Sequence, residues 1–306
     1  MIFDLEEVIV AADIGGTKMR VALVRGDGSV LLSREQPTPH NVGVPDELTD
    51  LISSIAHHVL AGERSASRVV VGLPGPVDYR SGKLLWAPHL PESWPDQLSE
   101  SQLRTTIGLP VHVANDADLA ALGEAYFGAG SAYRDVAYVT ISTGIGAGFV
   151  FDGQLLRGKR SLGEIGHTII DWMAWSALEP ATLEELASGS GMTRMAVERG
   201  LGALSGKEIS ELAHRENVDA LQIWRGAVSA AAAGTFNLAT AFSPEIIVIG
   251  GGLGLQLDFF LALEETFSRH VPRRMPSTPL VPAALGDNAG LIGAARWTAL
   301  AGIDDR

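Results

Sequence analysis

The sequence contains no cysteine among its 306 residues. Disulfide bonds, thiolate nucleophiles and metal sites built on cysteine are therefore excluded. Basic residues are also few, with 23 Lys and Arg against 36 Asp and Glu, and the formal net charge is −13. No cluster of cations is dense enough to follow a phosphate backbone, so nucleic acid is a poor candidate partner.

Long apolar runs are missing as well. The alanine-rich stretch 226–242 comes nearest to a membrane span, but Ser, Thr and Asn interrupt it. The first residues, MIFDLEEVIVAADIGG, lack the basic region and the cleavage site of a signal peptide. The sequence therefore predicts a cytoplasmic protein without membrane association. Its length and its hydrophobic content of 46% suffice for two domains, each with its own core.

What the chain does contain is a repeated order of strands and turns. A strand-like run at Val8–Ala12 leads through DIGGTK into Met19–Val24, and an Asp-Gly turn leads on to Val30–Arg34. The same order recurs in Val136–Ser142, a glycine turn, Gly146–Phe151, an Asp-Gly turn and a short third run. This pattern predicts a structural duplication in which each half begins with an antiparallel meander.

Each half offers a second strand that ends in a glycine turn, at Arg68–Leu73 and at Glu245–Ile249. Helical patterns lie between the strands, at Asp46–Leu60, Ala117–Phe127, Thr182–Ser188, Gly191–Arg199, Lys207–Arg215, Ala220–Phe242, Phe259–His270 and Gly290–Ala301. Strands that alternate with helices indicate an α/β fold. A further strand ends at Asn115-Asp116, where we place the boundary between an N-terminal domain, 1–116, and a larger C-terminal domain, 117–289.

Two glycine turns are candidates for phosphate binding. A glycine turn after a buried strand lets backbone N–H groups approach phosphate oxygens, and Lys18 adds a cation beside the first turn. A tight hairpin explains either motif alone equally well, but two of them at matching places favour phosphate binding. Neither is a GxxxxGK[ST] P-loop, and no GxGxxG opens a helix, so a dinucleotide fold is not indicated.

Asp116 is the candidate general base. A carboxylate at the end of a strand, facing a cleft between domains, can accept the proton of a substrate hydroxyl. Its position before a helix fits an N-cap as well, and the spacing alone favours that interpretation.

Glu164 and His167, three residues apart and flanked by glycines, could together orient the hydroxyls of a polyol. A surface turn with a satisfied histidine is the alternative. Glu184 would by itself pass for an acid at a helix start. Four tryptophans could stack on a sugar, although core-filling tryptophans are commoner. These are Trp86, Trp94, Trp172 and Trp175.

With these motifs in order, the sequence resembles the ROK family of bacterial sugar kinases and repressors, within the actin-like ATPase superfamily. The resemblance covers nearly the whole chain and rests on DIGGTK, GLPGPVD, NDAD with AALGEA, STGIGAG, GEIGH, LEELASG, VIGGG and DNAGLIGAA. It implies two actin-like (ribonuclease H-like) α/β domains that flank a cleft, with a C-terminal helix, 290–306, returning to the N-terminal domain.

The resemblance also implies roles for individual residues. Asp116 matches the catalytic aspartate. Gly75, His89, Asn115, Asp116, Glu164, His167 and Glu184 match sugar-contacting positions. Asp13, Gly15, Gly16, Thr17 and Lys18, with Thr143 and Gly144, match the phosphate loops, and Gly251 with Gly252 matches the adenosine-side turn. The implied cofactors are ATP and Mg²⁺, with Asp13 as an outer-shell carboxylate.

Two departures from the family pattern stand out. Trp175, Ala177 and Thr182 occupy the places of the cysteines in the family's CxCGxxGCxE zinc motif, so we expect no bound metal of that type. His167 must then be oriented by something other than zinc. His89 replaces the asparagine of the usual APN segment, and an imidazole there is expected to change which hexose is accepted.

We therefore expect ATP-dependent phosphorylation of a hexose, at the 6-hydroxyl, with glucose as the first candidate and mannose, fructose, allose and N-acetylmannosamine open. A non-catalytic sugar-binding protein is the alternative. A repressor is disfavoured, because DIGG at residue 13 leaves no room for a DNA-binding segment before it. The family tendency implies a homodimer or homotetramer.

Overall fold

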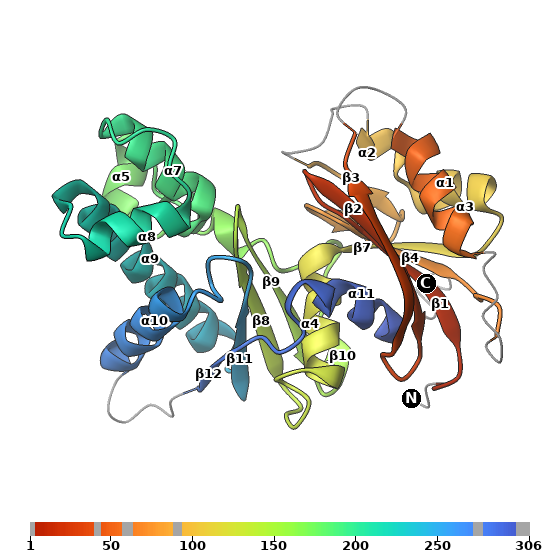
Figure 1. The fold of residues 1–306 in the computed structure, drawn as a ribbon. Helices are drawn as coiled ribbons and strands as arrows, with labels where there is room; N and C mark the ends of the chain where they lie inside the picture. Colours follow the sequence, from red (N-terminus) through yellow and green to blue (C-terminus); the bar gives the residue numbers. More distant parts are fainter. Residues whose placement is uncertain (1–3, 40–43, 57–63, 88–93, 272–277, 298–306) are drawn as a thin grey trace.

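The computed structural model describes residues 4–39, 44–56, 64–87, 94–271 and 278–297. Two five-stranded sheets of matching topology dominate it, with strand orders β3-β2-β1-β4-β7 and β10-β9-β8-β11-β12 (Figure 1). In each sheet the first three strands form an antiparallel meander, and two later strands add in parallel beside the first. The predicted duplication and the α/β class are confirmed.

The first sheet consists of β1 (Val8–Ile14), β2 (Lys18–Arg25), β3 (Val30–Pro37), β4 (Val69–Leu73) and β7 (Val111–Asn115). The second consists of β8 (Val136–Ile141), β9 (Ile145–Phe151), β10 (Gln154–Leu155), β11 (Ile246–Gly250) and β12 (Leu280–Pro282). A small hairpin is formed by β5 (Val77–Asp78) and β6 (Lys83–Leu84). The helices are α1 (Val44–Ala56), α2 (Trp94–Gln97), α3 (Glu100–Ile107), α4 (Asp116–Phe127), α5 (Trp172–Ser176), α6 (Leu183–Ala187), α7 (Gly189–Glu198), α8 (Gly206–His214), α9 (Val218–Phe242), α10 (Leu257–His270) and α11 (Ala289–Gly293), with 3-10 turns η1 (Ile165–His167), η2 (Gly286–Asn288) and η3 (Ala294–Arg296).

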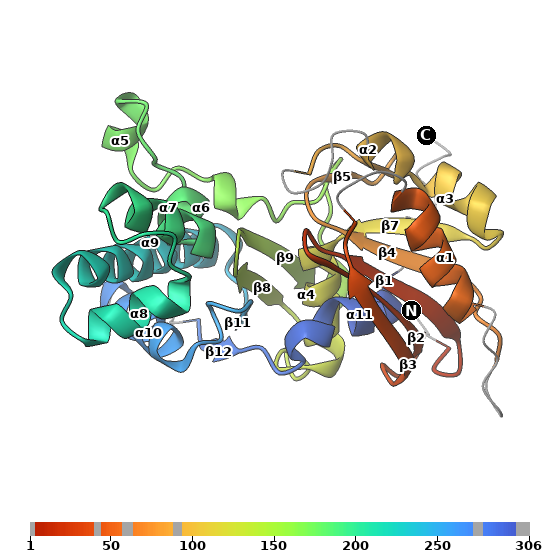
Figure 2. The ribbon, with the colours of Figure 1, turned by 45° about the horizontal axis from the view of Figure 1, so that its top comes forward.

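In the central strands β1, β4, β8 and β11 both faces are buried, because apolar side chains stand on both sides. The edge strand β3 is largely exposed. In β1, Val8 and Val10 join the core beneath α1, α2 and α3, whereas Ile9 and Ala11 face the middle of the molecule. The outer face of the second sheet packs against α6 to α10. Between the sheets lie α4 and α11 (Figures 1 and 2).

The two central helices touch through glycine. A Cβ on Gly123 of α4 would lie 2.2 Å from the Ala289 carbonyl oxygen, and one on Gly293 of α11 would lie 1.8 Å from that of Leu119. Only hydrogen at these positions lets the helix backbones approach so closely. The segment that begins near residue 290 therefore packs against α4 and, through α11, contacts β1 and β2.

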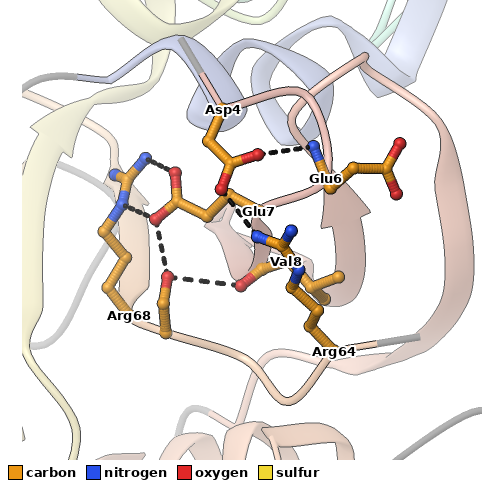
Figure 3. A network of polar contacts seen from close by, with 7 residues as sticks. Asp4, Glu6, Glu7, Val8, Arg64 and Arg68 are labelled. Atoms are coloured by element: carbon orange, nitrogen blue, oxygen red, sulfur yellow. Dashed lines mark hydrogen bonds and ion pairs between the residues drawn. The ribbon is translucent and has the colours of Figure 1, made fainter.

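At the amino end of β1, a polar network ties the start of the chain to the segment before β4 (Figure 3). The Arg68 side chain donates to both carboxylate oxygens of Glu7, at 3.1 and 3.4 Å, and to the Trp297 carbonyl at 3.0 Å. The Arg64 side chain donates to Asp4 at 2.7 Å. These contacts fix the end of the sheet that lies away from the glycine turn after β1.

Several elements were not anticipated. Helix α3 begins at a Ser99 cap and ends at Gly108, which has φ +77°, so both of its ends carried ordinary sequence signals. The short strand β12 has no comparable signal.

The last helix was predicted from about residue 290 to the end of the chain. Residues up to Arg296 are helical, and residues 298–306 lie outside the described residues. Asp116 begins α4, which packs on both sheets, so the domain division at 116 stays a prediction.

Across the described ranges, no helix is long and apolar enough to cross a membrane.

Candidate active site

A cavity of about 350 Å³ opens where the carboxyl ends of the strands in the two sheets meet. Its walls come from Asp13, Gly15, Gly16, Thr17, Lys18, Pro74, Gly75, Trp86, Asn115, Asp116, Ala117, Thr140, Ser142, Thr143, Gly144, Ile145, Gly146, Gly163, Glu164, His167 and Glu184. The fold thus brings together every predicted site residue except His89, Gly251 and Gly252. His89 lies outside the described residues.

Asp116 lines this cavity, and it is not the helix cap. The cap of α4 is Asn115, whose side-chain oxygen accepts from the N–H groups of Ala117 at 3.1 Å and Asp118 at 3.2 Å. The N-cap interpretation of Asp116 is therefore wrong. Asp116 Oδ1 accepts from the Ala117 N–H at 2.8 Å, which fixes the carboxylate at the helix start.

Burial raises the pKa of Asp116 to about 7, and the charges of Asp13 and Glu164 contribute to the rise. A carboxylate with such a pKa holds a proton more readily than an exposed aspartate, so it can take one from a hydroxyl near neutral pH. This is the electrostatic character expected of a general base.

Asn115 also connects the start of α4, where Asp116 stands, to the neighbouring glycine turn. Its side-chain nitrogen donates to the Gly75 carbonyl at 3.0 Å, and its backbone N–H donates to the Tyr79 hydroxyl at 3.2 Å. The same Tyr79 hydroxyl donates to the fully buried Asp118. The turn that carries Asp116 is therefore held by hydrogen bonds on both sides.

The first glycine turn joins β1 to β2. The Gly15 N–H donates to the Lys18 carbonyl at 2.9 Å, and the buried Thr38 hydroxyl donates to the Gly15 carbonyl at 2.7 Å. The Lys18 ammonium lies 3.5 Å from Glu35 and 3.4 Å from Asp287. In this structure the Lys18 charge is thus shared with two carboxylates.

Asp13 pairs with Arg20, a residue that the sequence reasoning missed. The Arg20 guanidinium donates to Asp13 Oδ2 at 2.5 Å and also to the Asp287 carbonyl. Asp13 and Arg20 stand directly opposite each other in the β1–β2 hairpin. The short turn fixes the register of the hairpin, and opposite charges at paired positions then predict an ion pair. The Asp13–Arg20 pair could therefore have been predicted from the sequence.

The second glycine turn joins β8 to β9 and is held by Glu184. The Ile145 N–H donates to Glu184 Oε2 at 2.8 Å, and a Cβ on Gly144 would lie 2.6 Å from the same oxygen. Glycine at 144 therefore leaves the space that Glu184 fills. Glu184 lines the cavity and also lies in the first turn of α6. Its position therefore agrees both with an acid at a helix start and with a residue of the site.

Glu164 and His167 line the same cavity beside each other. His167 Nε2 is 3.8 Å from Glu164 Oε2, and burial raises the pKa of Glu164, an effect that His167 opposes. The His167 ring also faces the Trp86 indole, with ring centroids 6.2 Å apart. A carboxylate and an aromatic ring therefore accompany this histidine.

The segment around α5 carries Trp175, Ala177 and Thr182, the positions where the family's zinc motif has cysteine. This segment projects from the C-terminal half of the molecule (Figure 2). It is closed by backbone hydrogen bonds, from Ile170 N–H to the Ala181 carbonyl at 2.8 Å and from Leu183 N–H to the Thr168 carbonyl at 2.9 Å. Thr182 caps α6 in a capping box with Glu185. No group of three His, Asp or Glu side chains suited to a metal lies within the described ranges.

We predict that the purified protein contains well under one zinc per chain, because tryptophan, alanine and threonine occupy the cysteine positions. Activity should survive chelation once Mg²⁺ is restored. Elemental analysis of the protein before and after chelation checks this. One tightly bound zinc per chain, lost together with activity, would contradict it.

A second cavity, of about 560 Å³, adjoins the first and shares Ser142 and Thr143 with it. Gly252 lines this second cavity. Gly251 lies behind it, with φ +81°, and a Cβ there would be 2.4 Å from the Ile141 carbonyl oxygen. Such a turn accepts only glycine without strain. The predicted adenosine-side turn is thus placed beside the predicted phosphate loops.

The two cavities can hold a nucleoside triphosphate. The second glycine turn stands where the cavities join, and the first lines the smaller cavity, so both can offer backbone N–H groups to phosphate. Asp13 is the carboxylate nearest to the first turn in sequence, and its charge is partly neutralised by Arg20. A Mg²⁺ ion bound mainly through phosphates and water could be accommodated with Asp13 in its outer shell.

Two repeated sheets, a cleft between them, glycine turns and a half-buried carboxylate define a two-lobed phosphotransferase of the actin-like fold. The profile of the ROK family matches residues 9–300, and the chain belongs to this family.

Several of the proteins that this chain resembles are sugar kinases. A glucokinase of Streptomyces coelicolor is 30% identical over 309 residues, covering 94% of this chain and 96% of its own. The crystal structure of a ROK hexokinase from Thermus thermophilus is 31% identical with a TM-score of 0.82, covering 94% and 96%. That of a ROK glucokinase from Streptomyces griseus, solved with glucose and AMPPNP, is 29% identical with a TM-score of 0.76, covering 94% and 98%.

Proposed function

We propose that this protein transfers the γ-phosphoryl group of ATP to the 6-hydroxyl of a hexose, with Asp116 as the general base. The enzyme class, an ATP-dependent sugar kinase, follows from the family and from relatives that are glucokinases and hexokinases. The sugar, the hydroxyl and the residue roles are the proposal. The observation that carries it is the half-buried Asp116, with its pKa raised to about 7, in a cavity that two glycine turns also line.

In the proposed reaction, Asp116 accepts the proton of the sugar hydroxyl as that oxygen bonds to the γ-phosphorus and the bond to ADP breaks. Because Oδ1 accepts from the Ala117 N–H, Oδ2 is the oxygen we assign to the hydroxyl. Asn115, Glu164, His167 and Glu184 orient the other hydroxyls, and the turn at Gly75 lines the same wall. Catalysis is then mainly alignment and charge stabilisation.

The nucleotide is assigned to the two adjoining cavities. The turns at residues 15–18 and 143–144 hold its phosphates through backbone N–H groups, and the cavity beside Gly252 takes the adenosine. Mg²⁺, when bound with the phosphates, would neutralise part of the charge on the transferred group. Lys18 would exchange its contacts with Glu35 and Asp287 for a phosphate oxygen.

A panel of glucose, mannose, fructose, allose and N-acetylmannosamine, each with ATP and Mg²⁺, tests the proposal through sugar-dependent release of ADP. Glucose is our first choice because a Streptomyces relative is a glucokinase. A chain that binds a sugar but releases no ADP would be the non-catalytic alternative. The cytoplasmic location, the lack of nucleic-acid binding and the homodimer or homotetramer stay predictions.

The pH dependence of kcat/KM for the sugar should report the free base. Because burial and Asp13 raise the pKa of Asp116 to about 7, the ionised form is lost as pH falls through that value. We expect kcat/KM to be level above pH 8 and to fall about tenfold per pH unit well below 7. The residual activity of Asp116→Asn should lack this acid limb. A parent midpoint near pH 4 would show that Asp116 titrates like an exposed carboxylate.

A further inference from the structure

Trp86 is a large aromatic side chain that stays half exposed at the wall of the cavity. Its exposed fraction is 51%, whereas Trp94, eight residues later, is 2% exposed within the core beneath α1 to α3. Cavities for small ligands combine a few polar groups with aromatic surface. An indole left uncovered beside Asn115 and His167 therefore offers contact area to whatever enters the cavity.

The place of Trp86 is set by its backbone. Gly75 has φ +114°, and a Cβ there would lie 2.3 Å from the Trp86 carbonyl oxygen. The Leu85 N–H donates to the Pro76 carbonyl at 2.9 Å. Since Asn115 also binds the Gly75 carbonyl, one glycine turn connects Trp86 with the strand end that carries the base. Replacing the indole should leave this backbone arrangement unchanged.

Trp86 also meets the opposite half of the molecule. It follows β6 in the N-terminal half, whereas His167 belongs to η1, which contacts β9 and α6 of the C-terminal half. The two rings lie 6.2 Å apart with an angle of 50° between their planes. They therefore face each other across the cleft, with Glu164 on the same side as His167.

The chemistry of a hexopyranose matches this wall. Its hydroxyls need acceptors and donors, which Asn115, Glu164 and Glu184 supply, while its ring C–H groups form an apolar face. An aromatic ring provides large and rigid contact for such a face at a low cost in conformational entropy. Among the described residues that line the cavity, Trp86 has the largest side chain with an apolar face.

We propose that Trp86 binds the C–H face of the hexopyranose substrate and, with His167, encloses the sugar end of the cleft. The proposal rests on the proposed function, because it assumes that the acceptor sugar occupies this cavity. Trp86 would be a binding residue that contributes equally to the ground state and the transition state. Its loss should then raise the KM for the sugar and leave kcat nearly unchanged.

The test compares Trp86→Phe and Trp86→Leu with Trp172→Phe, a control at an exposed tryptophan of α5 outside the cavity. We expect Trp86→Leu to raise the sugar KM about tenfold, with kcat and the KM for ATP within about twofold of the parent. Trp86→Phe should raise the sugar KM by a smaller factor. In titrations without nucleotide, sugar should change the tryptophan fluorescence of the parent and of Trp172→Phe, but not that of Trp86→Phe.

The two readouts separate the two hypotheses. Parent-like KM values in Trp86→Leu, together with a preserved fluorescence change in Trp86→Phe, would overturn the role of Trp86 while the kinase activity stands. A fluorescence change that depends on Trp86, without turnover of any sugar in the panel, would support the role and contradict the proposed function. If the parent shows neither signal with any sugar, both fail.

Discussion

Replacing Asp116 with asparagine should lower kcat by ~10²–10⁴-fold, the range associated with removal of a general base. The carboxamide keeps the shape of the side chain and can accept from the Ala117 N–H, as Asp116 Oδ1 does at 2.8 Å. It cannot accept a proton from the sugar. Coupled measurement of ADP release gives kcat, and calorimetry should show that the sugar still binds.

Asp118→Asn is the matched control for this experiment. Asp118 lies two residues further along α4, is fully buried, and has its pKa raised to about 7 by burial, but it does not line the cavity. Its contact with the Tyr79 hydroxyl can be kept by the amide oxygen. Turnover in this variant should stay within several-fold of the parent. If Asp116→Asn and Asp118→Asn lose activity equally, removal of a buried charge explains the loss and the base assignment fails.

Folding should not explain the effect of Asp116→Asn. Because the pKa of Asp116 is raised in the folded protein, its contribution to stability is full at low pH and is lost as pH rises through about 7. Asparagine does not ionise, so the variant does not lose stability in this way as pH rises. The variant should therefore melt no lower than the parent at pH 8, and any gain should shrink towards pH 5. Thermal melts at both values check the sign.

The largest loss of stability is expected from Glu124→Leu. Glu124 of α4 is fully buried, and its carboxylate accepts from three backbone N–H groups, of Ala129 at 2.8 Å, Ala284 at 3.1 Å and Leu285 at 2.8 Å. Leucine would leave these three donors, whose bonds to Glu124 are partly buried, without this acceptor. At 1–3 kcal/mol for each unsatisfied group, part of it relieved by relaxation, we expect a loss of ~3–5 kcal/mol in the free energy of unfolding.

Urea denaturation measures this loss, with two further variants for comparison. Glu124→Gln retains one oxygen that can accept, so its loss should be intermediate. Glu198→Gln, at an exposed glutamate of α7, should change the free energy of unfolding by less than ~0.5 kcal/mol. A urea midpoint of Glu124→Leu equal to that of the parent would show that Glu124 does not hold residues 284–285 against α4.

Both predictions concern α4, the helix that links the cavity to the centre of the fold. Asp116 stands at its first residue, and Glu124 stands two turns later, where the chain returns from β12 towards α11. The same returning segment carries Asp287, which contacts Lys18 and Arg20 of β2. Loss of the Glu124 contacts should therefore disturb the first glycine turn as well as the stability of the fold.

Much of the fold was predictable because its signals are local. Alternating apolar residues and glycine turns defined the two meanders, and the order of motifs defined the duplication. Helix α3 was missed although Ser99 and Gly108 mark its ends, because eight mostly polar residues give little periodicity. The cap of α4 was assigned one residue too late, since Asn115 and Asp116 are both good caps and only the backbone conformation distinguishes them.

The sequence alone determined which chemical groups stand at the strand ends, because a strand, a turn and a helix start are specified within a few residues. Asp13, the two glycine turns and Asp116 were named on that basis, supported by the family resemblance. Their positions in one cavity follow from the duplicated topology.

Only the tertiary structure decided how those groups behave. The raised pKa of Asp116 depends on burial between two sheets and on Asp13, about a hundred residues earlier in the chain. Other contacts likewise join distant segments of the chain. The Lys18 ammonium pairs with Asp287, and the Glu124 carboxylate accepts from the Ala284 N–H. The Trp86 ring faces the His167 ring. Desolvation and charge depend on everything packed around a group, so they are fixed when the two halves close on α4 and not by the local sequence.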